Sequence, residues 1–230
     1  LSKDEKIMME KRAQLLVDQG LAKDLKEARD DNYKYIVCKL KSPSTSIINM
    51  LEKYKFYLSD IGINWKIKVD KYLSINKKQG SSSHAEPREA VLNDIPGLQE
   101  MIRPMFPNSR FYSDPFFSHK EADDLHEIWI ENSVLGKAAD IVFHIPKKGF
   151  VTCKNQEHGV GEIILIGVKD GHRGNKLGKT LMDSSVNWFS NNGIKTIEIK
   201  TQLKNAGAIN FYSQLGFSID GYDMTFSYTV

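Results

Sequence analysis

Cysteine and long apolar runs are scarce in this chain of 230 residues. Its two cysteines, Cys38 and Cys153, form no C-x-x-C pair, so the sequence indicates neither a disulfide framework nor a cysteine zinc site and favours a reducing compartment. No apolar run approaches the ~18 residues that a membrane-spanning helix requires. We therefore expect a cytoplasmic protein without a membrane span.

An excess of one charge is also missing. The 32 Lys and Arg residues exceed the 29 Asp and Glu residues by a net charge of +3, which is too small an excess to indicate nucleic-acid binding. The six histidines show neither a metal-ligand spacing nor an evident catalytic triad, so no bound metal is expected. The chain starts at Leu1 rather than at Met, as in a trimmed chain or a piece of a longer one. The sequence leaves assembly as a homodimer open.

Small polar residues mark the clearest linker, GSSSHAEPR at positions 80–88, which contains a proline near its end. It predicts an amino-terminal unit at 1–79, a linker at 80–87 and a larger domain at 88–230. The pattern of the larger domain predicts an α/β (α+β) fold. Its expected elements are strands near 88–92, 140–145, 149–154, 161–168 and 195–201, further strands within 217–230, and helices near 95–103, 119–135, 175–190 and 205–216.

The amino-terminal unit contains a segment that resembles the end of the chain. Residues 34–66 align with residues 195–227 without a gap. The identical pairs are Lys34/Lys195, Ile36/Ile197, Lys39/Lys200, Ile48/Ile209, Asn49/Asn210 and Phe56/Phe217. A duplicated strand–helix–strand unit is one interpretation, and the general pattern of any such unit is the other.

The two copies differ at polar positions. Ser44 and Leu51 stand where the second copy has Asn205 and Tyr212, and residues 1–33 contain no glycine turn. We therefore expect the amino-terminal copy to act as a scaffold or as an acceptor surface.

A basic, glycine-rich turn, GHRGNKLGKTLMD at 171–183, lies between an apolar strand and a predicted helix. Backbone N–H groups at a helix N-terminus bind anions, and glycine lets a phosphate approach the chain. A nucleoside-triphosphate loop requires G-x-x-x-x-G-K-[ST], but its first glycine would fall on Arg173. Only 50 residues follow Thr180, which is short for the rest of such a domain. An acyl-CoA turn fits the surrounding sequence better.

The segment GEIILIGVKDGHRGNKLGKTLMD, followed by NAGAINFYSQLGF, resembles the GNAT superfamily of acetyl-CoA-dependent N-acetyltransferases. The resemblance covers residues 88–230. Its N-x-x-A-x-x-x-Y-x-x-x-G-F pattern is complete, whereas its Q/R-x-x-G-x-G/A turn starts at Arg173 and has Lys176 at the usual place of the first glycine. The resemblance implies a mixed, mostly antiparallel sheet flanked by helices, with a truncated GNAT-like unit at the amino terminus.

The resemblance also implies where acetyl-CoA binds. The backbone of residues 166–168 would pair with the pantetheine arm as an added strand does, and its amides could stabilise the oxyanion. The expected cofactor-binding residues are Ile166, Gly167, Val168, Arg173, Gly174, Asn175, Lys176, Leu177, Gly178, Lys179, Asn205, Ala208 and Tyr212. For the basic residues the alternative is a solvated turn, and for Asn205 it is a helix N-cap.

Two residues are candidates for catalysis. Tyr212 would protonate the leaving thiolate, because a phenol of pKa ~10 can protonate a thiolate of pKa ~8.5 at modest cost; the alternative is a core aromatic. Glu162 stands where some relatives in the superfamily keep a catalytic glutamate, and would act as general base. An exposed carboxylate at a strand end is the alternative, and water alone could deprotonate a weakly basic sugar amine.

The stretches WIENSVLGKAADIVFHI, GFVTCKN and NSRFY resemble members of the superfamily that acetylate nucleotide-linked 4-amino-6-deoxy sugars. The implied acceptor is a dTDP-linked amino sugar for surface polysaccharide synthesis. In the loop FPNSRFYSDPFF, Arg110 could face a diphosphate while Phe111 and Tyr112 stack on a base or sugar. A hydrophobic lid packed on the core is the alternative for this loop. Acetylation of a protein or small-molecule amine, or a non-catalytic acyl-CoA-binding module, are the alternative functions.

Overall fold

The protein is described by a computed structural model covering residues 18–76, 86–103 and 105–230. The strands are β1 (Tyr35–Lys41), β2 (Tyr57–Lys68), β3 (Arg88–Glu89), β4 (Ile141–Ile145), β5 (Gly149–Asn155), β6 (Val160–Val168), β7 (Thr196–Gln202) and β8 (Ser218–Thr229). The helices are α1 (Asp18–Asp30), α2 (Thr45–Lys53), α3 (Val69–Asn76), α4 (Ile95–Ile102), α5 (Arg110–Ser113), α6 (His119–Val134), α7 (Leu177–Asn191) and α8 (Ala206–Gln214). Most of the predicted linker, at 77–85, lies outside the described residues.

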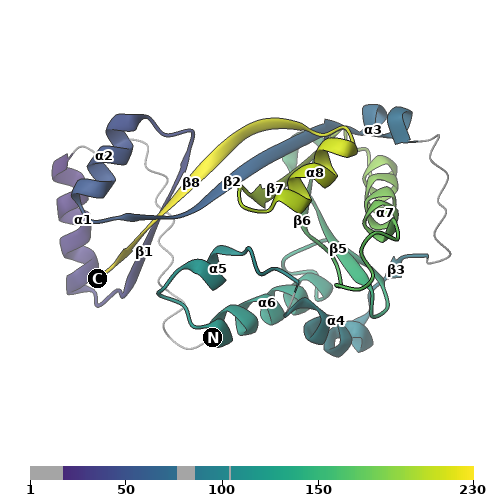
Figure 1. The fold of residues 1–230 in the computed structure, drawn as a ribbon, viewed down its shortest axis with the longest axis horizontal. Coiled ribbons are helices and arrows are strands. Elements are labelled where there is room, and N and C mark those ends of the chain that lie inside the picture. The colour runs from purple at the N-terminus through teal and green to yellow at the C-terminus, as the bar shows by residue number, and fades with distance from the viewer. Residues whose placement is uncertain (1–17, 77–85, 104) are drawn as a thin grey trace.

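The strands form one sheet in the order β1-β8-β2-β7-β6-β5-β4-β3 (Figure 1). Every neighbouring pair is antiparallel except β6 and β7, which run parallel. Helices pack on both faces of the sheet. The expected mixed, mostly antiparallel sheet flanked by helices is therefore confirmed.

The largest core lies between the sheet and α7, with α3 and α8 beside it. The apolar residues of α7 recur every three or four positions and so share one face of the helix. Phe189 from this face is completely buried, and a Cβ at Gly161 of β6 would overlap its ring. Glycine at 161 thus lets α7 approach the strand closely.

A second core covers the other face of β4, β5 and β6. Side chains of α4 and α6, among them Ile102 and Ile130, pack there against Phe150 and Leu165. Because β5 has a core on both faces, its first five residues, 149–153, are all buried.

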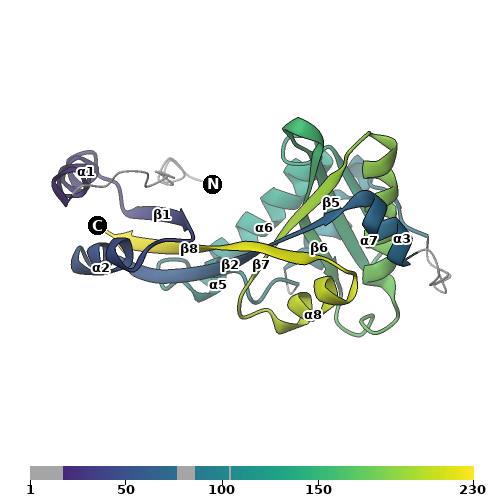
Figure 2. The ribbon, with the colours of Figure 1, turned by 90° about the horizontal axis from the view of Figure 1, so that it is seen from above.

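The two long strands β2 and β8 carry the sheet to the opposite end of the molecule, where α1 and α2 lie (Figures 1 and 2). A third core forms there, with Leu51 of α2 and Phe226 of β8 among its completely or almost completely buried members. The sequence predicted more than one strand within 217–230. This was wrong, because β8 pairs along its length with β1 and β2 and continues unbroken.

The predicted strand–helix–strand correspondence is present in the structure. The unit β1-α2-β2 and the unit β7-α8-β8 have the same element lengths and the same connections. Each helix or strand of the first unit starts and ends the same number of residues before its counterpart in the second. The first unit runs from Tyr35 to Lys68, and the second runs from Thr196 to Thr229.

Strand pairing follows the same correspondence. Tyr35 pairs with Thr229, and their counterparts Thr196 and Lys68 pair with each other. The β2–β8 ladder has an extra residue on each strand, and these two residues, at 59 and 220, are also counterparts. Each unit therefore inserts its second strand between the two strands of the other. The sheet is continuous across both units, and a domain division at 80–87 stays a prediction.

This interleaving leads to a prediction about cooperativity. Phe226→Ala should lower the free energy of unfolding by about 3–5 kcal/mol, because Phe226 is only 1% exposed on a strand that both units share. Urea unfolding followed by circular dichroism and tryptophan fluorescence should give one transition that shifts as a whole. Ile219→Ala on the same strand is the control, because Ile219 is 61% exposed. Two separable transitions, only one of them shifted, would contradict the interleaved core.

Candidate active site

The sheet opens between β6 and β7. These strands pair only from Val160 and Thr196 to Ile163 and Ile199. Just beyond, β6 contains a bulge that leaves Ile164 as the extra residue opposite β5. Past this point, β6 keeps its partner β5 on one side and has no ladder with β7 on the other.

The backbone of β6 has defined directions beyond the bulge. The N–H of Lys169 donates to the carbonyl of Lys148, at 2.8 Å, on the β5 side. Because successive residues of a strand point their backbone groups to opposite sides, Ile166 and Val168 point theirs away from β5, toward the opening. The carbonyl of Val168 accepts a hydrogen bond from Arg173 Nε at 3.2 Å. Ile166 and Val168 thus direct their backbone groups to the opening, where the carbonyl of Val168 is bonded to Arg173.

The turn after β6 uses left-handed backbone at three positions. Gly171 and Gly174 each have φ of +82°, and Lys176 has φ of +57°. The side chain of Arg173 folds back to Asp170, with 3.0 Å between Nη1 and Oδ1, and Asn175 donates to the carbonyl of His172. Lys176 therefore adopts a left-handed backbone conformation that glycine adopts more easily, at a cost of roughly 1–2 kcal/mol.

The amino end of α7 follows this turn directly, with Leu177 as its first residue. At Gly178, a Cβ would lie 3.3 Å from the ring of Phe211 in α8, so glycine allows α8 to approach closely. Lys179 is engaged by Asp183, with 2.7 Å between Nζ and Oδ2, and its side chain is only 14% exposed. Among the basic residues predicted for phosphate binding, Lys179 is thus the one that forms an ion pair within α7.

The helix α8 carries the second predicted set. Asn205 is its N-cap, and its side chain accepts from the N–H of Ala208 at 3.1 Å. Tyr212 is 4% exposed, with its ring centroid 6.1 Å from that of Trp65. Burial raises the pKa of Tyr212 above its ordinary value, so the phenol is protonated at neutral pH. Asn205 therefore makes the contacts of a helix cap, and Tyr212 makes those of a core aromatic.

Glu162 lies in the part of β6 that still pairs with β7. Its direct neighbours across the sheet are Lys154 of β5 and Glu198 of β7, and its carboxylate accepts from Gln156 Nε2 at 2.7 Å. Its neighbour Gly161 faces α7, so Glu162 points to the opposite face. A role as general base stays a prediction.

The predicted acceptor residues fall on α5. Arg110 stacks over the ring of Phe111, at 4.2 Å from the centroid, and its Nη1 lies 3.3 Å from the hydroxyl of Tyr35. Phe111 is buried with its ring edge-on to Phe117 and His126. These contacts match the alternative of a packed lid.

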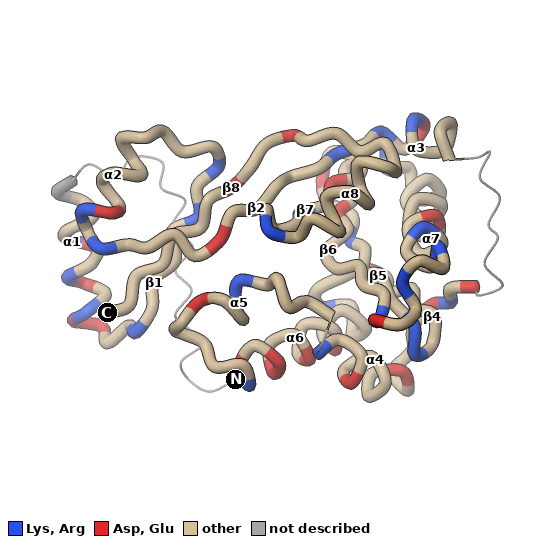
Figure 3. Tube along the Cα trace, viewed as in Figure 1, with Lys and Arg blue, Asp and Glu red and all other residues tan. Residues whose placement is uncertain are grey.

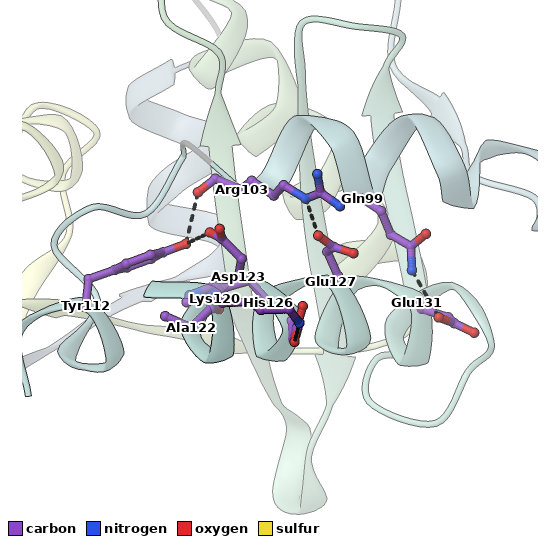
Figure 4. Close-up of polar contacts among 10 residues, drawn as sticks. Gln99, Arg103, Tyr112, Lys120, Ala122, Asp123, His126, Glu127 and Glu131 are labelled. Atoms are coloured by element: carbon purple, nitrogen blue, oxygen red, sulfur yellow. Dashed lines mark hydrogen bonds and ion pairs between the residues drawn. The ribbon is translucent and has the colours of Figure 1, made fainter. Parts of the chain in front are cut away.

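Tyr112 is also held by its surroundings. Its hydroxyl donates to Asp123 of α6 and to the carbonyl of Arg103, at 2.5 and 3.1 Å (Figure 4). Its ring stacks on His126 at 5.5 Å. Ligand contact by Phe111 or Tyr112 stays a prediction.

The same loop reaches β6. A Cβ at Gly167 would lie 2.7 Å from the sulfur of Met105 and 3.4 Å from Phe106. Gly167 therefore leaves room for the loop to pack directly on the strand that borders the opening. The loop 105–117 forms a wall of the candidate site.

Sequence reasoning missed the residue that fixes this loop, Asp114. It is 3% exposed and accepts hydrogen bonds from Tyr35 at 2.5 Å, Tyr57 at 2.7 Å and Ser227 at 3.1 Å. The sequence marks Asp114-Pro115 as a turn, but its three partners come from β1, β2 and β8. No local pattern could have named them.

Neither a metal-binding group nor a membrane-spanning helix is found among the described residues. Those residues contain no group of three or more His, Cys, Asp or Glu side chains placed to hold a metal ion. Among their helices, none has the length and apolar character needed to cross a membrane. Lys, Arg, Asp and Glu positions are interspersed along the described chain (Figure 3).

The left-handed Lys176 gives a test of the turn. Lys176→Gly should raise the free energy of unfolding by about 1 kcal/mol, because glycine adopts positive φ without the steric penalty. Lys176→Ala removes the same charge and keeps the penalty, so it should bring no such gain. Chemical denaturation of both variants measures the difference. Equal stability of the two would contradict a strained backbone at 176.

Comparison with known proteins identifies the family of the chain. The chain matches the profile of the Acetyltransferase (GNAT) family over residues 98–217, just over half of its length. It is 24% identical to dTDP-fucosamine acetyltransferase of Escherichia coli O6:H1 over 196 residues, 80% of this chain and 77% of that protein. It is 26% identical to the spore coat polysaccharide biosynthesis protein SpsD of Bacillus subtilis over 132 residues, 55% of this chain but only 45% of that protein.

Among solved structures, a tandem GNAT protein from the clavulanic acid biosynthesis pathway shares the fold. The TM-score is 0.63 at 11% identity, and the match covers 92% of this chain and 69% of that one. The match therefore extends over both strand–helix–strand units. The chain belongs to the GNAT family of acetyltransferases, which use acetyl-CoA as the acetyl donor.

Proposed function

We propose that the protein moves the acetyl group of acetyl-CoA to the amine of a dTDP-linked 4-amino-4,6-dideoxy sugar in a ternary complex. The likeness to dTDP-fucosamine acetyltransferase supports this acceptor, because it extends over 80% of the chain and so includes part of the amino-terminal unit. The likeness to a spore coat polysaccharide biosynthesis protein supports a role in surface polysaccharide synthesis. A cytoplasmic location is part of the proposal, and the alternative acceptor is a protein amine or another small-molecule amine.

The observation that carries the proposal is the open backbone edge of β6 beside the amino end of α7. We assign the pantetheine amides to the backbone of Ile166 and Val168, which point into the opening. We assign the pyrophosphate to the first N–H groups of α7 and to Arg173 and Lys176, where the helix dipole favours an anion. Asn205 would bond the pantetheine while it caps α8.

Bound acetyl-CoA supplies the thioester and a thiol leaving group. When the amine adds to the thioester carbonyl, backbone N–H groups of β6 at the opening would stabilise the oxyanion. As the C–S bond breaks, Tyr212 would donate its phenolic proton to the departing thiolate. Burial raises the pKa of Tyr212 and so makes it a weaker acid. The same apolar surroundings would also raise the pKa of the CoA thiol held beside it, because burial disfavours the charged thiolate. The difference between the two pKa values decides the transfer.

The acceptor amine must lose a proton before or during attack. The carboxylate of Glu162 is bonded to Gln156 and lies beside Lys154, where the sheet is still closed. This position favours deprotonation by water over a direct role for Glu162. Glu162→Gln distinguishes the two, because a general base contributes about 10²- to 10⁴-fold to the rate.

The acceptor is tested by thiol release. With acetyl-CoA, a dTDP-linked 4-amino-4,6-dideoxyhexose should give turnover with a kcat/KM at least tenfold above that of the UDP-linked sugar, a lysine peptide or an aminoglycoside. One CoA should bind per chain by calorimetry, because Ser44 and Leu51 stand in place of Asn205 and Tyr212 in the first unit. Preference for a protein or antibiotic amine would replace the proposed acceptor.

The role of Tyr212 is tested by Tyr212→Phe, which keeps the ring packed against Trp65 and removes the proton. We expect kcat to fall about 10²- to 10⁴-fold with acetyl-CoA affinity and stability nearly unchanged. Because the acid works only while protonated and burial raises its pKa, wild-type activity should persist above pH 10 before it falls. The variant should lose this alkaline limb. Full turnover by the variant would make Tyr212 a packing residue.

A further inference from the structure

One face of the sheet formed by β1, β8, β2 and β7 is polar. Directly paired residues share a face, so Lys39, Thr225 and Asp60 form a row across three strands. We call this surface the polar face. Its sheet residues are Lys39, Asp60, Asn64, Lys200, Gln202, Asp223 and Thr225. The alternate residues of β2 and β7, such as Ile63 and Ile199, lie in the core on the opposite side.

The polar face is more enclosed than a solvated sheet surface. Asp223 and Thr225 are only 7% and 5% exposed. Asp223 accepts hydrogen bonds from Lys200 and from Asn64 Nδ2, the latter at 3.2 Å. Burial raises the pKa of Asp223, but these bonds outweigh it and keep the pKa below its usual value. Asp223 is therefore a paired carboxylate within the polar face, and its charge is balanced by Lys200.

The helix α5 adds side chains to one border of this face. Lys204 Nζ donates to Ser113 Oγ at 2.5 Å, and Arg110 reaches the hydroxyl of Tyr35. The positive charges of Lys204, Arg110 and Lys39 act to lower the pKa of the Asp60 carboxyl group. Burial nonetheless raises the pKa of Asp60 above its usual value.

The polar face adjoins the opening between β6 and β7. Gln202 ends β7 opposite Gly62, and the N–H of Leu203 donates to the carbonyl of Ile61 at 2.7 Å. Asp60 therefore lies about 7 Å further along β2 than the end of this pairing. Lys204 immediately precedes Asn205, the cap of the helix that carries the predicted acid.

We propose that the polar face binds the diphosphate of the acceptor, with Lys204 and Arg110 as its main contacts, while the sugar amine extends to the opening. This rests on the proposed function, because it assumes a nucleotide-linked acceptor. Four cations, Lys39, Arg110, Lys200 and Lys204, lie among three carboxylates, Asp60, Asp223 and Asp114, the last bonded to the Tyr35 hydroxyl that Arg110 also reaches. One positive charge remains in excess, which favours an anion such as a diphosphate. Arginine and lysine are the side chains that bind phosphate best, and arginine can bind it through two parallel bonds. The amino-terminal unit would contribute Lys39 and Asp60 to this site, beside the main contacts from α5 and from the residue before Asn205.

The test is calorimetry with thymidine diphosphate on protein saturated with CoA, so that CoA phosphates cannot occupy the face. Lys204→Ala should raise the Kd for thymidine diphosphate about tenfold to a hundredfold, as loss of a charge-assisted hydrogen bond does. Asp60→Asn should lower this Kd, because it removes a negative charge beside Lys204 and Arg110. Lys120→Ala on α6 is the matched control, since its exposed lysine pairs only with Asp124 in the contacts described, and should leave the Kd unchanged.

The outcomes separate this proposal from the proposed function. Binding of thymidine diphosphate that neither Lys204→Ala nor Asp60→Asn alters would overturn the assignment of the polar face and leave the nucleotide-linked acceptor standing. Weaker CoA binding by Lys204→Ala, with thymidine diphosphate unaffected, would assign the face to the donor and also overturn it. No binding of thymidine or uridine diphosphate by the wild type would overturn both.

Discussion

The early end of the ladder between β6 and β7 is the constraint on which the site depends. Parallel strands need a crossover, and α7 supplies it, so α7 must begin at the carboxyl end of β6. The helix α8 begins at the carboxyl end of β7, which is the same edge of the sheet. An unpaired strand edge and the starts of two helices therefore meet in one place. The bulge at Ile164 allows this without exposing the β5 side, because the buried hydroxyl of Thr152 accepts from the N–H of Leu165.

Asp114 links this edge to the amino-terminal unit. Its carboxylate is buried, so each of its bonds to Tyr35, Tyr57 and Ser227 satisfies a group that would be costly to leave unpaired. Burial, and next the hydrogen bond that Tyr57 donates to Asp114, raise the pKa of Tyr57 to about 12. The loop 105–117 is thereby fixed at this end on three strands and at the other end on β6. Movement of the amino-terminal unit would move the loop that borders the opening.

The sequence predicted what depends on local pattern. The strand–helix–strand correspondence, the turn before α7 and the cap at Asn205 all follow from residues close together in the chain. The interleaving of strands could not be predicted, because either copy could pair within itself with the same hydrophobic pattern. The packing of Phe111 was left open for a related reason, since its partners, Phe117 and His126, also suit an exposed stacking platform. The left-handed backbone of Lys176 could not be predicted either, because residues other than glycine rarely adopt positive φ.

The two symmetric units explain why one chain would carry one donor site. Leu51 occupies the position of Tyr212 and is completely buried, so the first unit has an apolar core contact where the second has a phenol. Ser44 stands at the cap position of Asn205, and its hydroxyl lies 2.9 Å from that of Ser46 instead of capping α2. No parallel strand adjoins β1 as β6 adjoins β7, because β1 ends the described sheet. Without that neighbour no opening between parallel strands can form, and the first unit is left to shape the surface beside the second.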